Sequence, residues 1–349
     1  MTNRRHFIAG LLATGLVPAP TWADVGGPAY LAAAALSDGS FSLCGIDRNL
    51  DIIFQLPLPG RGHAAAAHPT RPQAVAFARR PGNFAMVIDC LSGKVTARLE
   101  APNKRHFFGH GVFSQDGTRL YTTENDYAAG TGRIGVWDVE LGYVRVDEFA
   151  SGGIGPHDIK RLPDTDVLVV ANGGIDTHPD SGRVKLNIPT MHPNLSYIED
   201  RKVVEQVDLA PELHKNSIRH LALGQDGLVA FGMQWQGGAT PPPLVGLHRR
   251  GETISLLPSN DDMRGYIGSI AMSGDGSQIA VTSPRAGLVQ VFDTGSRTQS
   301  DSIAFTDVSG VAPGADGFVI TSGTGKLQGL GMPPGPAKSL MWDNHLVDI

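Results

Sequence analysis

Residues 109–138 read GHGVFSQDGTRLYTTENDYAAGTGRIGVWD, and this stretch decides the fold. It holds a His-headed apolar segment, an SQDG turn, a second apolar segment at 120–123, a polar loop and a third segment that ends in VWD. The same order recurs at 217–230, 268–293 and 310–321. Short strands separated by turn residues and repeated at this length are typical of a β-propeller.

The composition fits an all-β chain that is rich in turns. The 349 residues include 44 Gly and 24 Pro, and apolar residues come in short bursts. A net charge of -5 without a basic stripe argues against a nucleic-acid partner. No stretch after the N-terminus reaches the roughly 18 apolar residues of a membrane span. We therefore expect one propeller domain over residues 24–349, in which each blade packs against its two neighbours.

The N-terminus has the pattern of an export signal. Arg4 and Arg5 precede an apolar run at 9–17, and small residues follow it up to Ala23. This pattern predicts a signal peptide over residues 1–23 with cleavage after Ala23. The paired arginines resemble a twin-arginine signal, so we expect a periplasmic protein exported already folded, with any cofactor inserted beforehand. The alternative is a membrane-anchoring helix, for which the apolar run is short.

The two cysteines occupy different places in their repeats. Cys44 comes before the strand-ending Asp of its repeat, and Cys90 comes after it. This offset makes a disulfide improbable even in an oxidising compartment. We expect both residues to be small buried side chains.

The repeats count to seven blades. Segments 30–36, 41–47 and 51–58 align as the second, third and fourth strands of the first blade, whose innermost strand is missing. The remaining six blades open at positions spaced by 47, 47, 63, 49 and 41 residues, namely His63, His110, His157, His220, Ser269 and Gly310. The closing NHLVD at 344–348 matches RHLAL at 219–223, so the C-terminus supplies the missing strand and closes the ring.

Five of the seven equivalent positions on the innermost strands are histidines. They are His63, His110, His157, His220 and His345, although the whole chain has only 12 His. Each one alone is explained as a polar residue bound to channel water. Five imidazoles packed together must be neutral, because protonated rings would repel one another, and neutral imidazoles bind metal ions well. The sequence therefore predicts a metal site held by these five residues.

Imidazole ligation without thiolate suits iron, copper or zinc and argues against magnesium or calcium. Pure ligand chemistry favours copper, and haem in the channel mouth is a less favoured alternative. Asp158 follows His157 directly, so it is either an acceptor for a ligand histidine or an ordinary sheet contact.

Three long loops, at 124–132, 172–195 and 234–244, lie at the end of the ring where the innermost strands begin. Long insertions over one mouth usually cover a site. The side chains that could form a lid or a second, weaker site are Glu124, Asp126, Asp176, His178, Met191, His192 and Trp235. The alternative for each is an ordinary surface loop residue.

The His-headed repeats, the insertion GGIDTHPDSGRVKLNIPTMHPNLSYI and the closing WDNHL together resemble an uncharacterised bacterial family, a domain of unknown function. The resemblance covers the mature chain. It implies twin-arginine export and a seven-bladed propeller of the WD40/YVTN type. Family members are encoded beside imelysin-like iron-regulated proteins and di-haem peroxidase-like proteins, which implies a link to iron handling and favours iron over zinc. It supplies no catalytic residues.

We thus expect a periplasmic metal-binding propeller in iron uptake or metal redox handling, with imelysin-like or di-haem periplasmic proteins as partners. Two other functions stay open from the sequence. One is a lactonase-like hydrolase that uses the channel histidines with a hydrolytic metal. The other is an interaction scaffold for an iron-uptake partner. Whether the protein is an enzyme is left open by the sequence.

Overall fold

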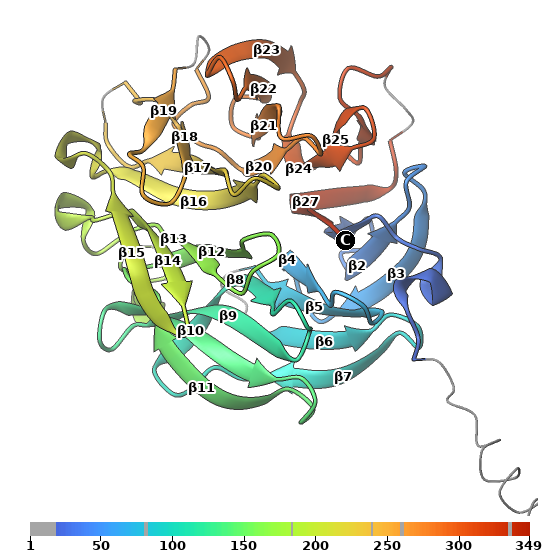
Figure 1. Cartoon of the computed structure of the whole chain (residues 1–349). Helices are drawn as coiled ribbons and strands as arrows, with labels where there is room; N and C mark the ends of the chain where they lie inside the picture. The colour runs from blue at the N-terminus through green and yellow to red at the C-terminus, as the bar shows by residue number, and fades with distance from the viewer. Residues whose placement is uncertain (1–18, 80–82, 183, 239, 259–261, 334–336) are drawn as a thin grey trace, which may run out of the picture.

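The chain forms seven antiparallel sheets arranged around a central axis (Figure 1). The computed structural model describes residues 19–79, 83–182, 184–238, 240–258, 262–333 and 337–349. Most of the expected signal peptide, residues 1–18, lies outside the described residues, so the export signal stays a prediction. The expected seven-bladed all-β fold is confirmed.

Each blade takes its strands in chain order from the axis outward, except the first, in which the last strand of the chain is innermost. Blade one is β27 (Leu340–Asp348), β1 (Tyr30–Leu36), β2 (Phe41–Ile46) and β3 (Ile52–Leu58). Blades two and three are β4 (Gly62–Ala67), β5 (Gln73–Ala78), β6 (Ala85–Asp89), β7 (Lys94–Leu99), and β8 (Arg105–Phe113), β9 (Arg119–Asp126), β10 (Thr131–Asp138), β11 (Val144–Ala150).

Blade four is β12 (Pro156–Arg161), β13 (Leu168–Asn172), β14 (Asn194–Glu199) and β15 (Lys202–Asp208). Blade five is β16 (Asn216–Leu223), β17 (Val229–Trp235), β18 (Val245–His248) and β19 (Ser255–Leu257). Blade six is β20 (Ser269–Met272), β21 (Gln278–Ser283), β22 (Leu288–Asp293) and β23 (Thr298–Ala304), and blade seven is β24 (Val308–Gly314), β25 (Gly317–Ser322) and β26 (Leu327–Gly329). Short 3-10 turns lie at Trp22–Val25, Pro179–Ser181, Ile188–Thr190 and Pro211–Leu213.

The C-terminal strand closes the ring as the sequence predicts. β27 pairs antiparallel with β1, where Asp348 lies opposite Tyr30 and Leu346 lies opposite Ala32. Figure 1 shows the C-terminus near the middle of the disc. Because blade one combines both ends of the chain, every blade has a neighbour on each side, and the circle of blades is closed.

Seven apolar clusters hold the blades together, one between each pair of neighbours. Trp137 packs between blades two and three, and Phe292 packs between blades five and six. The aspartates that follow them cap turns: Asp138 accepts a hydrogen bond from the Leu141 amide at 2.9 Å, and Asp293 accepts one from the Ser296 amide at 2.7 Å. Such repeated burial, worth about 25 cal/mol per Å² of apolar surface, is the main source of stability in a propeller.

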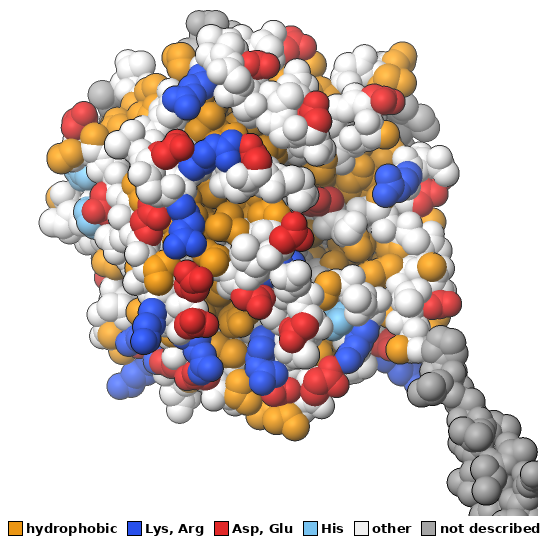
Figure 2. All heavy atoms as spheres, in the orientation of Figure 1, with side chains coloured by type: hydrophobic (Ala, Val, Ile, Leu, Met, Phe, Trp, Pro, Cys, Tyr) orange, Lys and Arg blue, Asp and Glu red, His pale blue; other side chains and the backbone are white. Residues whose placement is uncertain are grey.

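Cys44 and Cys90 are both buried free thiols that form no disulfide, as expected. Burial raises the pKa of each thiol to about 12, which makes both inert as nucleophiles at neutral pH. No helix within the described residues is long and apolar enough to cross a membrane. On the face drawn in Figure 2, acidic and basic side chains are intermixed.

Candidate metal centre

The five histidines come together at the axis from five innermost strands, β27, β4, β8, β12 and β16. Going around the ring, the centroids of successive imidazoles lie 4.5 Å (345 to 63), 5.1 Å (63 to 110), 5.2 Å (110 to 157), 4.8 Å (157 to 220) and 4.9 Å (220 to 345) apart. The imidazoles also meet across the centre, since His110 and His345, which are not successive, lie 4.7 Å apart, so the ring is a compact cluster. His345 lies on the innermost strand of blade one, where the closure predicts it.

A β-bulge aims each of these side chains at the axis. The pairing between the first two strands shifts register at His63, at His110, at His157 and at the stretch 343–345 that contains His345. In β16 the unpaired residue is Arg219, directly before His220. A bulge bends its strand and redirects the side chain, so the same irregularity in five blades places the five imidazoles together.

Gly109 makes room for the ring beside His110. Its φ of +101° lies in the region that favours glycine, and a Cβ there would come within 2.8 Å of Cδ2 of His63. The first residue of the stretch that decides the fold is therefore also a spacer between two imidazoles.

The ring is buried and favours neutral imidazoles. Burial lowers the pKa of His63 to about 4. Burial, reinforced by neighbouring positive charges, lowers the pKa values of His157, His220 and His345 well below 6.5. Neutral imidazole is the form that binds metal ions, so the site holds these rings in the ligating state at neutral pH.

Asp158 orients His110. Its Oδ1 lies 3.1 Å from Nδ1 of His110, and its Oδ2 accepts a hydrogen bond from the Leu221 amide at 2.9 Å. Burial alone would raise the pKa of this carboxyl, but its electrostatic interaction and hydrogen bond with His110 outweigh burial and lower the pKa below its usual range. A carboxylate on one ring nitrogen makes the other nitrogen a better ligand. Asp158 thus provides the acceptor that the sequence suggests, and it links blades three, four and five.

Asp343 stands in a similar place beside His63. Its Oδ1 lies 3.6 Å from Nδ1 of His63, which is an ion-pair distance and too long for a hydrogen bond. Its two oxygens accept hydrogen bonds from Arg61 (2.6 Å) and Arg79 (2.5 Å). Burial would raise its pKa, but His63 and the two arginines outweigh burial and lower it. Sequence analysis missed Asp343, although its position two residues before His345 was a usable signal.

Several ring nitrogens are left facing the interior. Nδ1 of His157 donates to the carbonyl of Arg219 at 3.0 Å, so its Nε2 keeps the lone pair. The buried Nε2 atoms of His110 and His345 and the buried Nδ1 of His220 have no hydrogen-bond partner among the described residues. Buried polar atoms without partners are costly, which makes these nitrogens candidates for an ion.

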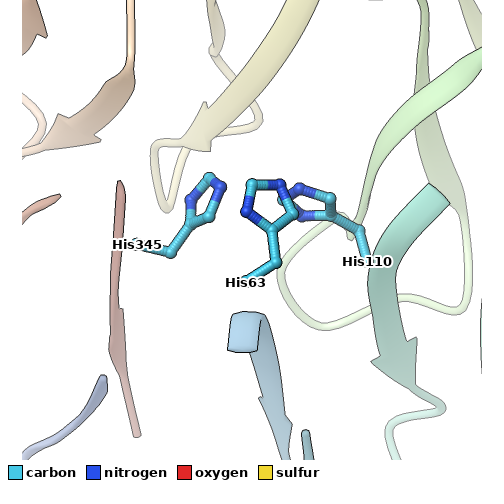
Figure 3. A group of neighbouring side chains, drawn as sticks. All are labelled: His63, His110 and His345. Atoms are coloured by element: carbon cyan, nitrogen blue, oxygen red, sulfur yellow. The ribbon is translucent and has the colours of Figure 1, made fainter. Parts of the chain in front are cut away.

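The ring contains two overlapping groups of three potential ligands. Ligand atoms of His63, His110 and His345 lie within 4.8 Å of one another, and so do those of His110, His157 and His220. Figure 3 shows the first group, with its three imidazoles turned toward one another. Three imidazoles with open positions are a donor set that iron, copper and zinc accept. His110 belongs to both groups.

Two cavities flank the ring and share His220. The first, of about 270 Å³, is lined by His110, His345 and mostly small residues that follow the histidines along their strands. The second, of about 280 Å³, is lined by His63 and His157 together with residues from the long insertion between β13 and β14. We call the second cavity the basic mouth, because its lining includes Arg79, Lys185, Arg219 and Arg285.

The insertion does cover the mouth, but with different residues from those the sequence suggests. Ile175, Thr177 and Lys185 of the insertion line the basic mouth, as does Gln234 at the start of the loop in blade five. The predicted lid residues Asp126, Asp176, His178, Met191, His192 and Trp235 are not among the described residues that line it.

Glu124 is not at the mouth either. Its carboxylate is fully buried within blade three and accepts hydrogen bonds from Arg145 at 2.6 and 3.0 Å. The lid role therefore does not apply to Glu124, which pairs across its own sheet. His192, also proposed for a lid, is exposed and lies 3.5 Å from Asp208 on β15.

Comparison with known proteins gives a fold and a family. The chain is similar to a chain of Kuenenia stuttgartiensis hydrazine synthase, with a TM-score of 0.63 and 15% identity over 88% of this chain and 95% of that chain. At this identity the likeness concerns the fold alone. No curated protein sequence matches the chain. Residues 56–349 match the model of the family described as protein of unknown function (DUF1513), and the chain belongs to that family.

Proposed function

We propose that this protein binds one transition-metal ion in its central channel through the five-histidine ring. The observation that carries the proposal is the convergence of imidazoles from five blades, with two groups of three ligand atoms each within 4.8 Å. The low pKa values of four of these histidines support it, since the rings are neutral and ready to ligate without first losing protons.

The number of ions follows from His110. Because Asp158 occupies Nδ1 of His110, only Nε2 is left for a metal, and both groups of three need that atom. We therefore expect one metal ion per chain, bound by one of the two groups of three. The carboxylate of Asp158 lies outside the ring of ligands and serves as the hydrogen-bond acceptor that fixes the imidazole.

Iron and copper are the metals we favour. The donor set is all imidazole, and the two cysteines are buried elsewhere, in the apolar clusters of blade one. Imidazole without thiolate suits both metals, and both change oxidation state. Iron is further supported by the family resemblance noted in the sequence, copper by ligand preference alone.

The cellular setting we propose is the periplasm, reached through the twin-arginine pathway, with a role in iron uptake or metal redox handling. The paired arginines at the N-terminus support this setting. Imelysin-like or di-haem periplasmic proteins are the partners we propose, on the family resemblance.

The test is elemental analysis of protein purified from the periplasm. We expect about one iron or copper per wild-type chain and a loss of metal in the His110→Ala/His157→Ala double variant, which breaks both groups of three. His214→Ala is the control, because His214 lies outside the ring and is partly exposed, with a hydrogen bond to the Pro211 carbonyl of its own turn. Equal and negligible metal in wild type and double variant, both folded, would refute the proposal.

A further inference from the structure

The basic mouth concentrates positive charge beside the histidine ring. Its four basic residues come from four places: Arg79 follows β5, Lys185 lies in the insertion, Arg219 is on β16 and Arg285 follows β21. No Asp or Glu is among the described residues that line it. This differs from the face drawn in Figure 2, where charges of both signs are intermixed.

The basic side chains lie close enough to act on one another. The pKa of Lys185 is lowered by burial first and then by repulsion from Arg219 and Arg285. Asp343 is 3% exposed and accepts hydrogen bonds from Arg79, which lines the mouth, and from Arg61, which does not. One carboxylate against two guanidiniums still leaves positive charge at that side. Holding like charges together costs free energy, which a bound anion would offset.

The chemistry of the lining suits a carboxylate ligand. The Arg285 guanidinium lies over the Tyr266 ring, 4.2 Å from its centroid, so its face is occupied and its N–H edge is left to donate. Guanidinium edges match carboxylates with paired hydrogen bonds, and Lys185 adds a compact charge. Phe108 and Ile175 give the cavity an apolar wall that suits a short carbon chain.

We propose that the basic mouth binds a small anion with two or more carboxylates. The cavity of about 280 Å³ has room for a di- or tricarboxylate of up to about six carbons. The cations are spread over several blades, so a ligand with several charged groups contacts more of them than acetate does. This inference goes beyond the metal site and does not require the ion.

The position of the mouth couples such an anion to the ring. His63, His157 and His220 line the basic mouth and also belong to the ring. An anion held there lies against the same imidazoles that we assign to the metal, so a carboxylate oxygen is available to complete its coordination. The anion site thus offers a route by which a metal chelated by a polycarboxylate is brought to the ring.

The experiment measures citrate binding to metal-free protein by isothermal titration calorimetry, with acetate as the single-carboxylate comparison. We expect wild type to bind citrate at least tenfold more tightly than acetate. Lys185→Gln/Arg285→Gln should weaken citrate binding by tenfold or more, since each lost charge-assisted hydrogen bond is typically worth about that factor. High salt should weaken binding in wild type.

The matched control is Lys160→Gln/Lys202→Gln. It also removes two positive charges, but neither lines the basic mouth. Lys160 lines the other cavity, and Lys202 is exposed on β15. We expect citrate binding within twofold of wild type. The charge-keeping change Lys185→Arg should retain citrate binding, which separates loss of charge from loss of structure. If the glutamine pair fails to fold, the single variants Lys185→Gln and Arg285→Gln replace it.

Absence of citrate binding to folded wild type, or equal weakening by the mouth pair and the control pair, overturns the inference. Since the titration uses metal-free protein, this result is independent of the metal analysis above. Metal binding without citrate binding would leave the ring proposal in place, and citrate binding without metal would leave the mouth proposal in place.

Discussion

In blades one to five the innermost strand brings an imidazole to the axis, whereas blades six and seven have Ser269 and Gly310 at the equivalent positions. The two small residues serve the closure of the ring. A Cβ on Gly310 would lie 2.7 Å from the Leu346 amide nitrogen and 3.0 Å from the His345 carbonyl carbon. Ser269 accepts a hydrogen bond from the Val311 amide at 3.4 Å. Gly310 therefore lets β27 approach and place the fifth imidazole, and Ser269 links blade six to blade seven.

The comparison also concerns the backbone. The five strands that supply imidazoles all have a register shift at that level, whereas β20 pairs with β21 in continuous register through Ser269. Blade seven has the shift but no side chain to aim. Blades one to five, which have both a bulge and an imidazole, form the candidate metal site. Blades six and seven have no imidazole at this level and contribute to closure of the ring.

The largest effect on metal binding by the imidazole blades is expected for His110→Ala. His110 belongs to both groups of three, so its loss should weaken metal binding by more than about 100-fold, roughly 3 kcal/mol. His345→Ala leaves the second group intact and should weaken binding less. Competition titration with a colorimetric chelator measures both. Equal affinities for the two variants would show that the groups do not overlap as described.

A smaller effect is expected for Asp158→Asn. The amide keeps the shape but not the charge that orients His110, and loss of such an acceptor typically weakens metal binding by about 10- to 100-fold. Asp316→Asn, on an exposed turn of blade seven, is the control and should bind as wild type does. An Asp158→Asn protein with wild-type affinity would make Asp158 a sheet contact only.

Gly310→Ala tests whether blade seven constrains the closing strand β27. The added Cβ meets backbone atoms of β27, which can move little, so we expect a loss of about 1–3 kcal/mol in the free energy of unfolding. Gly274→Ala is the control, because nothing lies within 4 Å of a Cβ there. Urea denaturation of the metal-free proteins measures both. Equal stability would mean that blade seven does not constrain the closing strand.

The smallest effect per residue is a pH dependence that only the imidazole blades should show. The folded pKa of His63 is about 4, and those of His157, His220 and His345 are well below 6.5, so the unfolded chain binds protons first as pH falls below about 6.5. Stability should therefore decrease from pH 7 toward pH 4, by at most about 1.4 kcal/mol per histidine per pH unit.

The measurement is urea denaturation of metal-free protein at pH 7.5 and pH 5.5. His157→Gln should reduce the loss of stability between the two, because one group that charges only on unfolding is removed. A wild-type stability that rises on acidification would contradict the burial of neutral imidazoles. Asp158 and Asp343 do not interfere, since their pKa values are lowered and their effect begins only below about pH 4.

Much of this arrangement could be predicted from the sequence because repeats carry it. The register of the blades, the closing strand and the five histidines all follow from aligning equivalent positions, and alignment uses only local patterns. The insertion at 172–195 could be assigned to the correct mouth from its place between the second and third strands.

The remaining features depend on contacts between distant segments. Asp343 bonds Arg61 and Arg79, which lie more than 260 residues earlier in the chain, so no local pattern reports the pairing. The four basic residues of the basic mouth likewise come from four different blades. In the insertion, sequence analysis chose residues by their chemistry, yet Lys185 faces the cavity while Asp176 does not line it. Which side of an irregular loop faces inward is set by tertiary packing.

The five-histidine ring is complete only after the closing strand β27 has joined blade one. His345 and Asp343 lie on β27, the strand that joins blade one to the rest of the ring, so a chain that has formed only β1 to β26 has four of the five imidazoles and an open ring. A truncated chain without β27 would lack both His345 and the strand that pairs with β1 to close the ring. Under the proposed function, metal binding would then require that β27 has joined blade one and closed the ring.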